Sequence, residues 1–230
     1  MPPSDRNPPN PLVSKGGTGG FLESPIALLA RGAAELGMSL APAQFDQFSR
    51  YLTELDVWNR RTNLTGTRDQ RELVTHHVLD SLAGDVVLQG LPDATEVADL
   101  GSGAGFPGVP LAIARPDLRV TLIEPRGKRA AFLLHVCGVL GLSRVTVVDR
   151  AIDPRDPGVY AGRFARVLAR AVADPVEAIR TARPLLGADG KVVVWVSDKQ
   201  AAEAPAEFQR VPYRIPGTTI ARVLLVASSR

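Results

Sequence analysis

Four glycines lie within eight residues in a segment that begins at Val97 and ends at Gly108. Short apolar residues precede them, and the apolar run Val109–Ala114, which predicts a helix, follows. Glycine accepts the positive φ values of a tight turn and lets backbone N–H groups approach a ligand closely. A strand, a glycine loop and a helix in this order predict a binding site for a cofactor that contains adenosine.

The spacing of these glycines fits two kinds of cofactor site. Gly103, Gly105 and Gly108 form the pattern G-x-G-x-x-G, which is typical of dinucleotide-binding enzymes. The pattern D-x-G-x-G-x-G, typical of class I methyltransferases that use S-adenosylmethionine, is formed by Asp99, Gly101, Gly103 and Gly105. The loop by itself leaves both kinds of enzyme open.

Two features further along the chain bear on this choice. The apolar segment Arg119–Glu124 predicts a second strand, and Glu124 at its end can accept both hydrogen bonds of a ribose diol. NAD and S-adenosylmethionine share that diol, so Glu124 does not separate them. The chain closes with two extended segments, Lys191–Ser197 and Ile220–Ala227, which fit the antiparallel terminal strands of class I methyltransferases. This ending favours S-adenosylmethionine.

The elements that position these residues follow from an alternation of apolar segments that begins near residue 95. It predicts a doubly wound α/β domain with helices between the earlier strands. Strands are expected at residues 95–100, 119–124, 144–149, 165–169, 190–197 and 219–227. We expect a tail without regular structure over residues 1–22, a helical N-terminal cap over 23–90 and a methyltransferase domain over 91–230.

Composition bounds the class of protein and its partners. The chain of 230 residues is 45% apolar and 22% charged, which is typical of a soluble globular protein. It has no run of the roughly 20 apolar residues that a membrane helix needs, and no apolar signal core near Met1. Cys137, the single cysteine, falls on an apolar helix stripe and is expected in the core. We expect a cytoplasmic protein, and a net charge of +3 permits a nucleic-acid partner without requiring one.

Three polar clusters could be functional or merely solvated. Asn63 follows a predicted helix and could cap that helix or recognise a ligand. His77 and Asp80, three residues apart, share one face of a helix expected over residues 73–88, either as a surface pair or as part of a site. Lys128 and Arg129 stand at a helix N-terminus, where positive charge opposes the helix dipole, so phosphate contact or plain solvation would explain them. No Cys or His at ligand spacing accompanies these residues, so no metal site is expected.

Taken together, these segments resemble one family, the RsmG (GidB) methyltransferases, which modify a guanine N7 in small-subunit (16S) ribosomal RNA. The resemblance covers roughly residues 25 to 175, in the family's order. Its motifs are Trp58-Asn59 with Asn63-Leu64-Thr65, His77-Val78-Leu79-Asp80-Ser81, the loop from Asp99 to Gly108, Gly127-Lys128-Arg129 with Phe132-Leu133, Arg150, and Arg170-Ala171.

The resemblance implies a Rossmann-like seven-stranded sheet behind a small helical region, with S-adenosylmethionine as cofactor. Together with the loop pattern, it implies cofactor contacts at Asp99, Gly101, Gly103, Gly105, Phe106, Glu124, Ala151, Ile152 and Arg170. Substrate contacts are implied at Asn63, His77, Asp80, Lys128 and Arg129, and catalytic roles at Arg170 and Asn63. One departure falls where the base would be approached: the family's Leu-Lys-Gly is replaced here by the segment Trp195–Gln200.

The implied reaction needs little acid–base chemistry, because N7 of guanine carries a lone pair and no proton. The expected partner is small-subunit ribosomal RNA or a ribosomal particle, with no membrane partner, and the enzyme is expected to be a monomer. The alternatives are a small-molecule methyltransferase of the same fold, an NAD-dependent oxidoreductase, and an RNA-binding protein without turnover.

Overall fold

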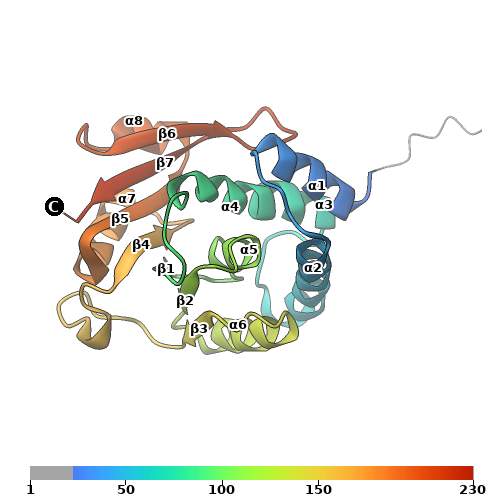
Figure 1. Cartoon of the computed structure of the whole chain (residues 1–230), viewed down its shortest axis with the longest axis horizontal. Coiled ribbons are helices and arrows are strands. Elements are labelled where there is room, and N and C mark those ends of the chain that lie inside the picture. Colours follow the sequence, from blue (N-terminus) through green and yellow to red (C-terminus); the bar gives the residue numbers. More distant parts are fainter. Residues whose placement is uncertain (1–22, 230) are drawn as a thin grey trace, which may run out of the picture.

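The computed structural model describes residues 23–229, so the tail predicted for residues 1–22 lies outside the described residues. At its centre is a seven-stranded sheet in the order β3-β2-β1-β4-β5-β7-β6 (Figure 1). The strands are β1 (Glu96–Leu100), β2 (Arg119–Ile123), β3 (Val145–Val148), β4 (Phe164–Ala169), β5 (Leu186–Val196), β6 (Gln209–Arg214) and β7 (Ala221–Ser228). Strands β1 to β5 pair in parallel, and β7 is antiparallel to both of its neighbours.

Helices cover both faces of this sheet and form the N-terminal region. They are α1 (Pro25–Glu35), α2 (Pro42–Thr62), α3 (Gln70–Leu73), α4 (Asp80–Leu82), α5 (Gly108–Ala114), α6 (Gly127–Val139), α7 (Pro175–Ala182) and α8 (Asp198–Glu203). A π-helical turn, Val74–Leu79, joins α3 to α4, and 3-10 turns lie at Ala83–Val87, Gly158–Tyr160 and Arg183–Leu185. The helix expected over residues 73–88 is thus a series of helical turns with a π-helix near its start.

The α/β class is confirmed, and each of the six expected strands is present. The seventh, β6, was missed because Pro212 and the alternation of exposed and half-buried residues in Gln209–Arg214 are weak strand signals. Such a strand is tolerated at the edge of a sheet, where β6 lies.

The expectation of helices between the earlier strands is wrong for the connection from β3 to β4. Residues 149–163 contain one 3-10 turn and no α-helix. Pro154, Pro157, Gly158 and Gly162 explain this, because proline and glycine both disfavour a helix interior.

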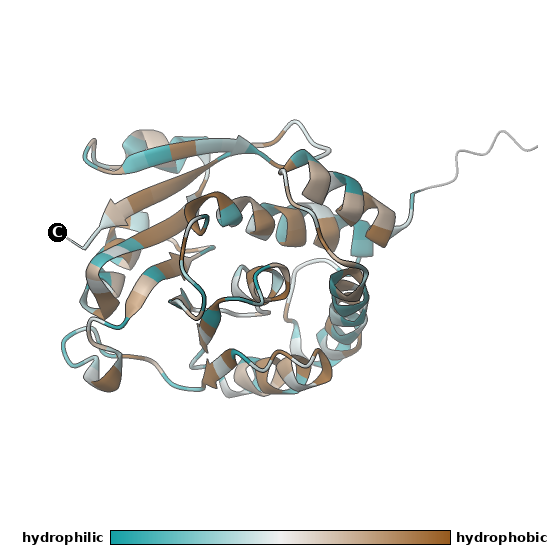
Figure 2. Cartoon of the chain, in the orientation of Figure 1, coloured by the Kyte–Doolittle hydropathy of each residue, from teal (hydrophilic) through white to brown (hydrophobic). Residues whose placement is uncertain are grey.

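The apolar core has two parts, one on each face of the sheet, and the strands between them are strongly apolar (Figure 2). The first part joins Phe48 and Tyr51 of α2 to Val109 of α5 and Phe132 of α6. The N-terminal helices therefore share a core with the sheet. The boundary at residue 90 stays a prediction. No helix of the described residues is long and apolar enough to cross a membrane.

Candidate active site

A cleft of about 510 Å³ opens at the carboxyl ends of the central strands. The glycine loop follows β1, Glu124 follows β2 and Arg170 follows β4, so the sheet brings three distant segments to one place. The lining residues are Leu64, Thr65, Gly66, His77, Leu100, Gly101, Ser102, Gly103, Ala104, Phe106, Glu124, Pro125, Arg126, Arg129, Arg170, Ala171 and Val172.

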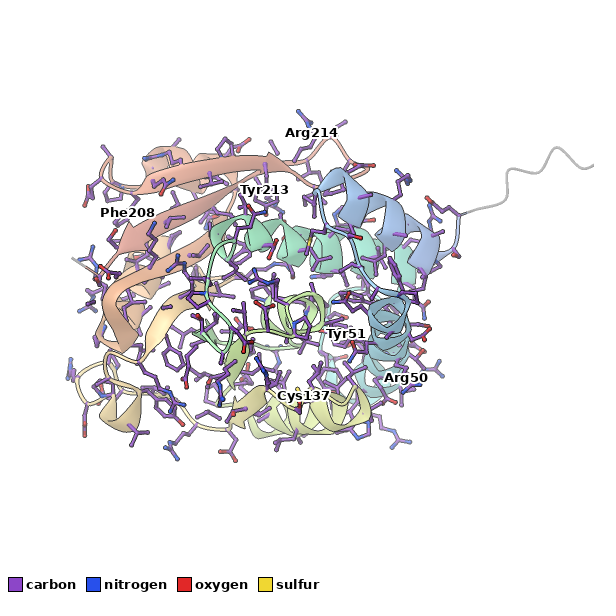
Figure 3. All side chains as sticks on the ribbon, viewed as in Figure 1. Arg50, Tyr51, Cys137, Phe208, Tyr213 and Arg214 are labelled. Atoms are coloured by element: carbon purple, nitrogen blue, oxygen red, sulfur yellow. The ribbon has the colours of Figure 1, made fainter. Side chains whose placement is uncertain are left out.

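The glycine loop has a backbone that other residues adopt only with strain. Gly101, Gly103 and Gly105 have φ values of 75°, 58° and 100°. A Cβ at Gly105 would lie 2.7 Å from a methyl of Val109 and 2.9 Å from the Tyr51 hydroxyl. That hydroxyl, on α2, donates a hydrogen bond of 2.7 Å to the carbonyl of Ala104. Helix α2, on which Figure 3 labels Tyr51, thus supports the loop.

Glu124 presents a fixed carboxylate to the cleft although its residue is only 3% exposed. Its Oε2 accepts a hydrogen bond of 2.8 Å from the Gly103 N–H, and its Oε1 accepts one of 2.8 Å from the Arg126 N–H. Each carboxylate oxygen can accept a further bond. Glu124 is therefore able to hold the hydroxyls of a ribose.

Asp99 lies beneath the loop and does not line the cleft. Its Oδ2 accepts a hydrogen bond of 3.0 Å from the Gly108 N–H, where α5 begins, while Oδ1 is buried with no partner among the described residues. Burial raises the pKa of this carboxyl to about 7, against the lowering effect of the bond from Gly108. A cofactor contact by Asp99 stays a prediction, because the structure places the side chain as a support of the loop.

Arg170 is held by oxygen atoms of the N-terminal helices. Its guanidinium donates to the carbonyls of His76 at 2.6 Å and His77 at 3.1 Å, and to the Ser81 hydroxyl at 3.1 Å. It also forms a buried ion pair with Asp80 at 3.1 Å. Both carbonyls belong to the π-helical turn, a rare form that often occurs at functional sites. The arrangement fixes Arg170 against the wall of the cleft.

Asp80 acts inside the protein and not at the cofactor cleft. The Tyr213 hydroxyl donates to its Oδ1 at 2.5 Å, and the indole N–H of Trp195 donates to its carbonyl at 2.8 Å. Tyr213 reaches this helix from β6, as Figure 3 shows. Sequence reasoning missed both partners, which lie more than a hundred residues from Asp80.

His77 faces the cleft, unlike Asp80. Its ring stacks on Phe106, with 5.0 Å between ring centroids, and its Nδ1 lies 3.1 Å from the Arg170 guanidinium. Burial, with smaller effects of the charges on Arg170 and His76, lowers the pKa of His77 to about 4. The imidazole is therefore neutral at neutral pH and accepts a hydrogen bond from Arg170 through Nδ1.

The structure gathers some of the predicted site residues and separates others. Gly101, Gly103, Phe106, Glu124, Arg170, His77 and Arg129 line the cleft. Asp99, Gly105, Asn63, Asp80, Lys128, Ala151 and Ile152 do not line it. Roles of this second group in direct binding stay predictions.

Asn63 has the left-handed backbone of a helix C-cap, with φ of 47°, and its side chain is exposed. The residues that enter the cleft are its neighbours Leu64, Thr65 and Gly66. Their turn is held by buried Asn59, whose amide donates to Thr65 Oγ1 at 2.8 Å and accepts from the Thr65 N–H at 3.0 Å. The Trp58-Asn59 pair was a signal for this residue, but its role as a brace was not foreseen.

No cluster of three His, Cys, Asp or Glu residues suited to a metal ion occurs among residues 23–229.

Fold and cleft define the class as S-adenosylmethionine-dependent methyltransferases. A putative S-adenosylmethionine-dependent methyltransferase from Methanococcus maripaludis superposes with a TM-score of 0.50, at 13% identity, over 77% of this chain and 91% of that one. MtNAS in complex with MTA and tNA gives 0.50, at 15% identity, over 88% and 75%. These two likenesses support the fold alone.

Sequence comparison gives the family. The family model described as GidB, rRNA small subunit methyltransferase G, matches residues 44–213. Ribosomal RNA small subunit methyltransferase G of Roseiflexus castenholzii is 38% identical over 86% of this chain and 89% of that protein. The protein of the same name from Sorangium cellulosum is 39% identical over 90% and 84%. The chain belongs to the rRNA small subunit methyltransferase G family, and its cofactor is S-adenosylmethionine.

Proposed function

We propose that this enzyme methylates N7 of a guanine in small-subunit ribosomal RNA. The observation that carries the proposal is the cleft, in which the glycine loop, the buried Glu124 carboxylate and the clamped Arg170 meet at the carboxyl ends of β1, β2 and β4. Membership of a family whose proteins are named for methylation of small-subunit rRNA supports the same substrate. The choice of guanine N7 rests on the motif resemblance.

The residues present fit the cofactor. The positive φ values of the loop let its backbone approach a ligand, and Glu124 offers acceptors for two ribose hydroxyls. S-adenosylmethionine supplies an electrophilic methyl group when it is bound. Phe106, stacked on His77, forms an apolar part of the wall. Arg170 keeps the wall in one position because the helix carbonyls hold it.

The chain's own groups orient the reactants and need not move a proton. N7 of guanine has a free lone pair, so a general base is unnecessary. The position of His77 supports the proposal: a neutral imidazole that accepts from Arg170 at Nδ1 carries its proton on Nε2 and offers no free base to the cleft. Rate enhancement would come from orientation, which alone can contribute about 7–11 kcal/mol to a reaction between two bound partners.

Basic residues beside the cleft suit the phosphates of RNA. Arg126 and Arg129 line its rim, and Lys128 is exposed on the same helix start. Arg60, a further basic residue near the end of α2, is exposed and pairs with Asp56 at 2.6 Å. We propose a cytoplasmic monomer that acts on rRNA, either free or in a ribosomal particle.

Methyl transfer from labelled S-adenosylmethionine tests the proposal. The substrates are small-subunit rRNA and small-subunit particles from a strain that lacks this protein, and the modified base is then mapped. A single N7-methylguanine in either substrate is the expected result. Label in neither, together with cofactor binding measured by calorimetry, would contradict the rRNA assignment and favour a small-molecule acceptor.

A further inference from the structure

A second, smaller hollow of about 190 Å³ adjoins the cofactor cleft. The two share Arg170, Ala171 and Val172, which form the wall between them. The rest of its lining comes from the N-terminal helices, from the strands β5 and β7 and from the start of α8: Asp80, Trp195, Val196, Ser197, Gln200 and Arg222. We call this hollow the side chamber.

We propose that the side chamber holds the target base and that Gln200 selects guanine there through its acceptor edge. This inference rests on the proposed function and names the residues that would read the substrate. The volume is below the roughly 300–1,000 Å³ of sites for drug-sized ligands. It therefore suits a single base, with the ribose and phosphates left outside.

The wall shared by the two cavities contains a residue, Ala171, in an uncommon backbone conformation. Ala171 has φ of 56°, which is uncommon for a residue with a Cβ, and it follows directly after the clamped Arg170. Residues held in sparsely populated backbone conformations cluster at active sites. The strained residue thus stands where cofactor and base would meet.

The side chamber is bordered by a fixed aromatic residue, Trp195, which is 5% exposed. The Trp195 ring is fixed because its N–H is bonded to the Asp80 carbonyl, and because Gly84 lies so close that a Cβ there would be 2.3 Å from the ring. Unstacked RNA bases are commonly bound against aromatic side chains and guanidinium planes. Trp195 and Arg170 provide one of each.

The free end of Gln200 is a hydrogen-bond donor. Its Oε1 accepts from the Ser197 N–H and the Ser197 hydroxyl, both at 3.1 Å, in the capping box that starts α8. This orientation leaves the amide N–H₂ without a hydrogen-bond partner among the described residues. Arg222 adds a further donor, and the Asp80 carboxylate is occupied by Tyr213 and Arg170, so the free polar groups of the lining are mainly donors.

A donor-rich chamber distinguishes the two purines. Guanine presents two adjacent acceptors, N7 and O6, where adenine presents N7 beside an amino donor. With N7 turned toward the shared wall, O6 would face the donors of the side chamber. Adenine in the same place would set its amino group against the Gln200 amide.

Gln200→Glu is the sharpest test because it replaces the donor with an acceptor of nearly the same size, at the cost of one added negative charge. Glutamate also completes a capping box with serine, so the start of α8 is preserved. Lys199→Gln, at an exposed position on the same helix, alters net charge by the same amount and is the matched control. Each variant is assayed for methyl transfer to small-subunit rRNA or particles, for S-adenosylmethionine affinity and for melting temperature.

We expect Gln200→Glu to lower kcat/KM for rRNA by about 10- to 100-fold, since a good contact to a base edge discriminates by about 1–3 kcal/mol. Cofactor affinity and melting temperature should match the wild type, and Lys199→Gln should retain wild-type kcat/KM. Wild-type activity of Gln200→Glu would overturn the proposal, as would a parallel loss of cofactor affinity. If the wild-type enzyme itself transfers no methyl group to rRNA, the proposed function fails instead.

Discussion

Arg170 shows how a side chain predicted as catalytic depends on groups that no local motif reveals. Its ion-pair partner Asp80 is 3% exposed and is itself held by the Tyr213 hydroxyl. Breaking such a network leaves charged oxygens without a donor inside the protein, which costs more than the bond itself contributes. We therefore expect substitution of the residues that support Arg170 to disturb its position.

Tyr213→Phe tests this dependence. Removing the hydroxyl leaves Oδ1 of Asp80 without that donor, so we expect the free energy of unfolding to fall by about 1–3 kcal/mol. Chemical denaturation measures the change. Tyr160→Phe is the matched control at a half-buried position of the β3–β4 connection, where we expect a change within about 0.5 kcal/mol. Equal effects of the two substitutions would contradict the role given to Tyr213.

Asp99 makes stability depend on pH. Its pKa is raised from 3.8 to about 7, so the folded protein retains a proton there that the unfolded chain releases at lower pH. The retained proton adds to the free energy of unfolding; this stabilisation is fully present below about pH 4 and is lost as the pH rises to about 7. At about 1.36 kcal/mol for each pKa unit, the total change is about 4 kcal/mol.

Asp99→Asn should remove this pH dependence. The advantage of the wild type over the variant in unfolding free energy should therefore shrink as the pH rises from about 4 to about 7. Asp93→Asn is the control, because the bond from Arg144 lowers the pKa of Asp93, so its contribution is fully present above about pH 4 and is lost only as the pH falls further. An unchanging difference between wild type and Asp99→Asn would refute the buried-proton account.

At the scale of elements, the strand–loop–helix unit was predictable because its determinants are consecutive residues. The glycine spacing marked the loop, and a carboxylate at the end of the next strand marked Glu124. The supports of the site were not predictable in this way, since Tyr51, Trp195 and Tyr213 reach it from α2, β5 and β6. In the sequence these three residues look like aromatic residues of an apolar core, and only the tertiary structure shows that each donates a hydrogen bond to a polar partner.

Two glycine substitutions compare a glycine that the cofactor loop requires with a helix glycine that the fold does not require. Gly105→Ala forces a Cβ between Val109 and Tyr51 at a φ of 100°, so we expect about 2 kcal/mol or more of lost stability and weaker cofactor binding. Gly138→Ala, in α6, meets no atom within 4 Å and should stabilise the protein by about 0.5–1 kcal/mol. Denaturation and calorimetry with S-adenosylmethionine measure both effects. Normal cofactor affinity in Gly105→Ala would show that the loop tolerates a side chain.

At the scale of the whole molecule, the proposed RNA contacts lie at the carboxyl end of the strands. Lys128 stands beside the cleft, whereas Arg119 is exposed at the opposite end of β2. Contacts to phosphate release counterions, so rRNA binding should weaken steeply with salt while cofactor binding without RNA should not. The position of the basic residues on the surface, and not the net charge alone, would then decide which face of the enzyme binds the rRNA.

Lys128→Gln tests the docking direction. It should reduce the slope of log affinity against log salt by about 0.7–0.9, the value for one lost phosphate contact. Arg119→Gln is the control, because it removes the same charge from the far end of β2 and should leave the slope unchanged. Filter binding of small-subunit rRNA across a salt series gives both slopes, and equal slopes for the two variants would point to a different docking face.

The bond between Tyr213 and Asp80 has a consequence for synthesis of the enzyme. The two residues are 133 positions apart, so at about 5–20 residues per second Asp80 leaves the ribosome roughly 7–27 s before Tyr213. During that interval β6 has not been synthesised, so Asp80, the ion-pair partner of Arg170, lacks its hydrogen bond from Tyr213. Nascent chains and truncated products that end before Tyr213 therefore lack this support of Arg170, and we expect methylation to begin only after β6 has been synthesised.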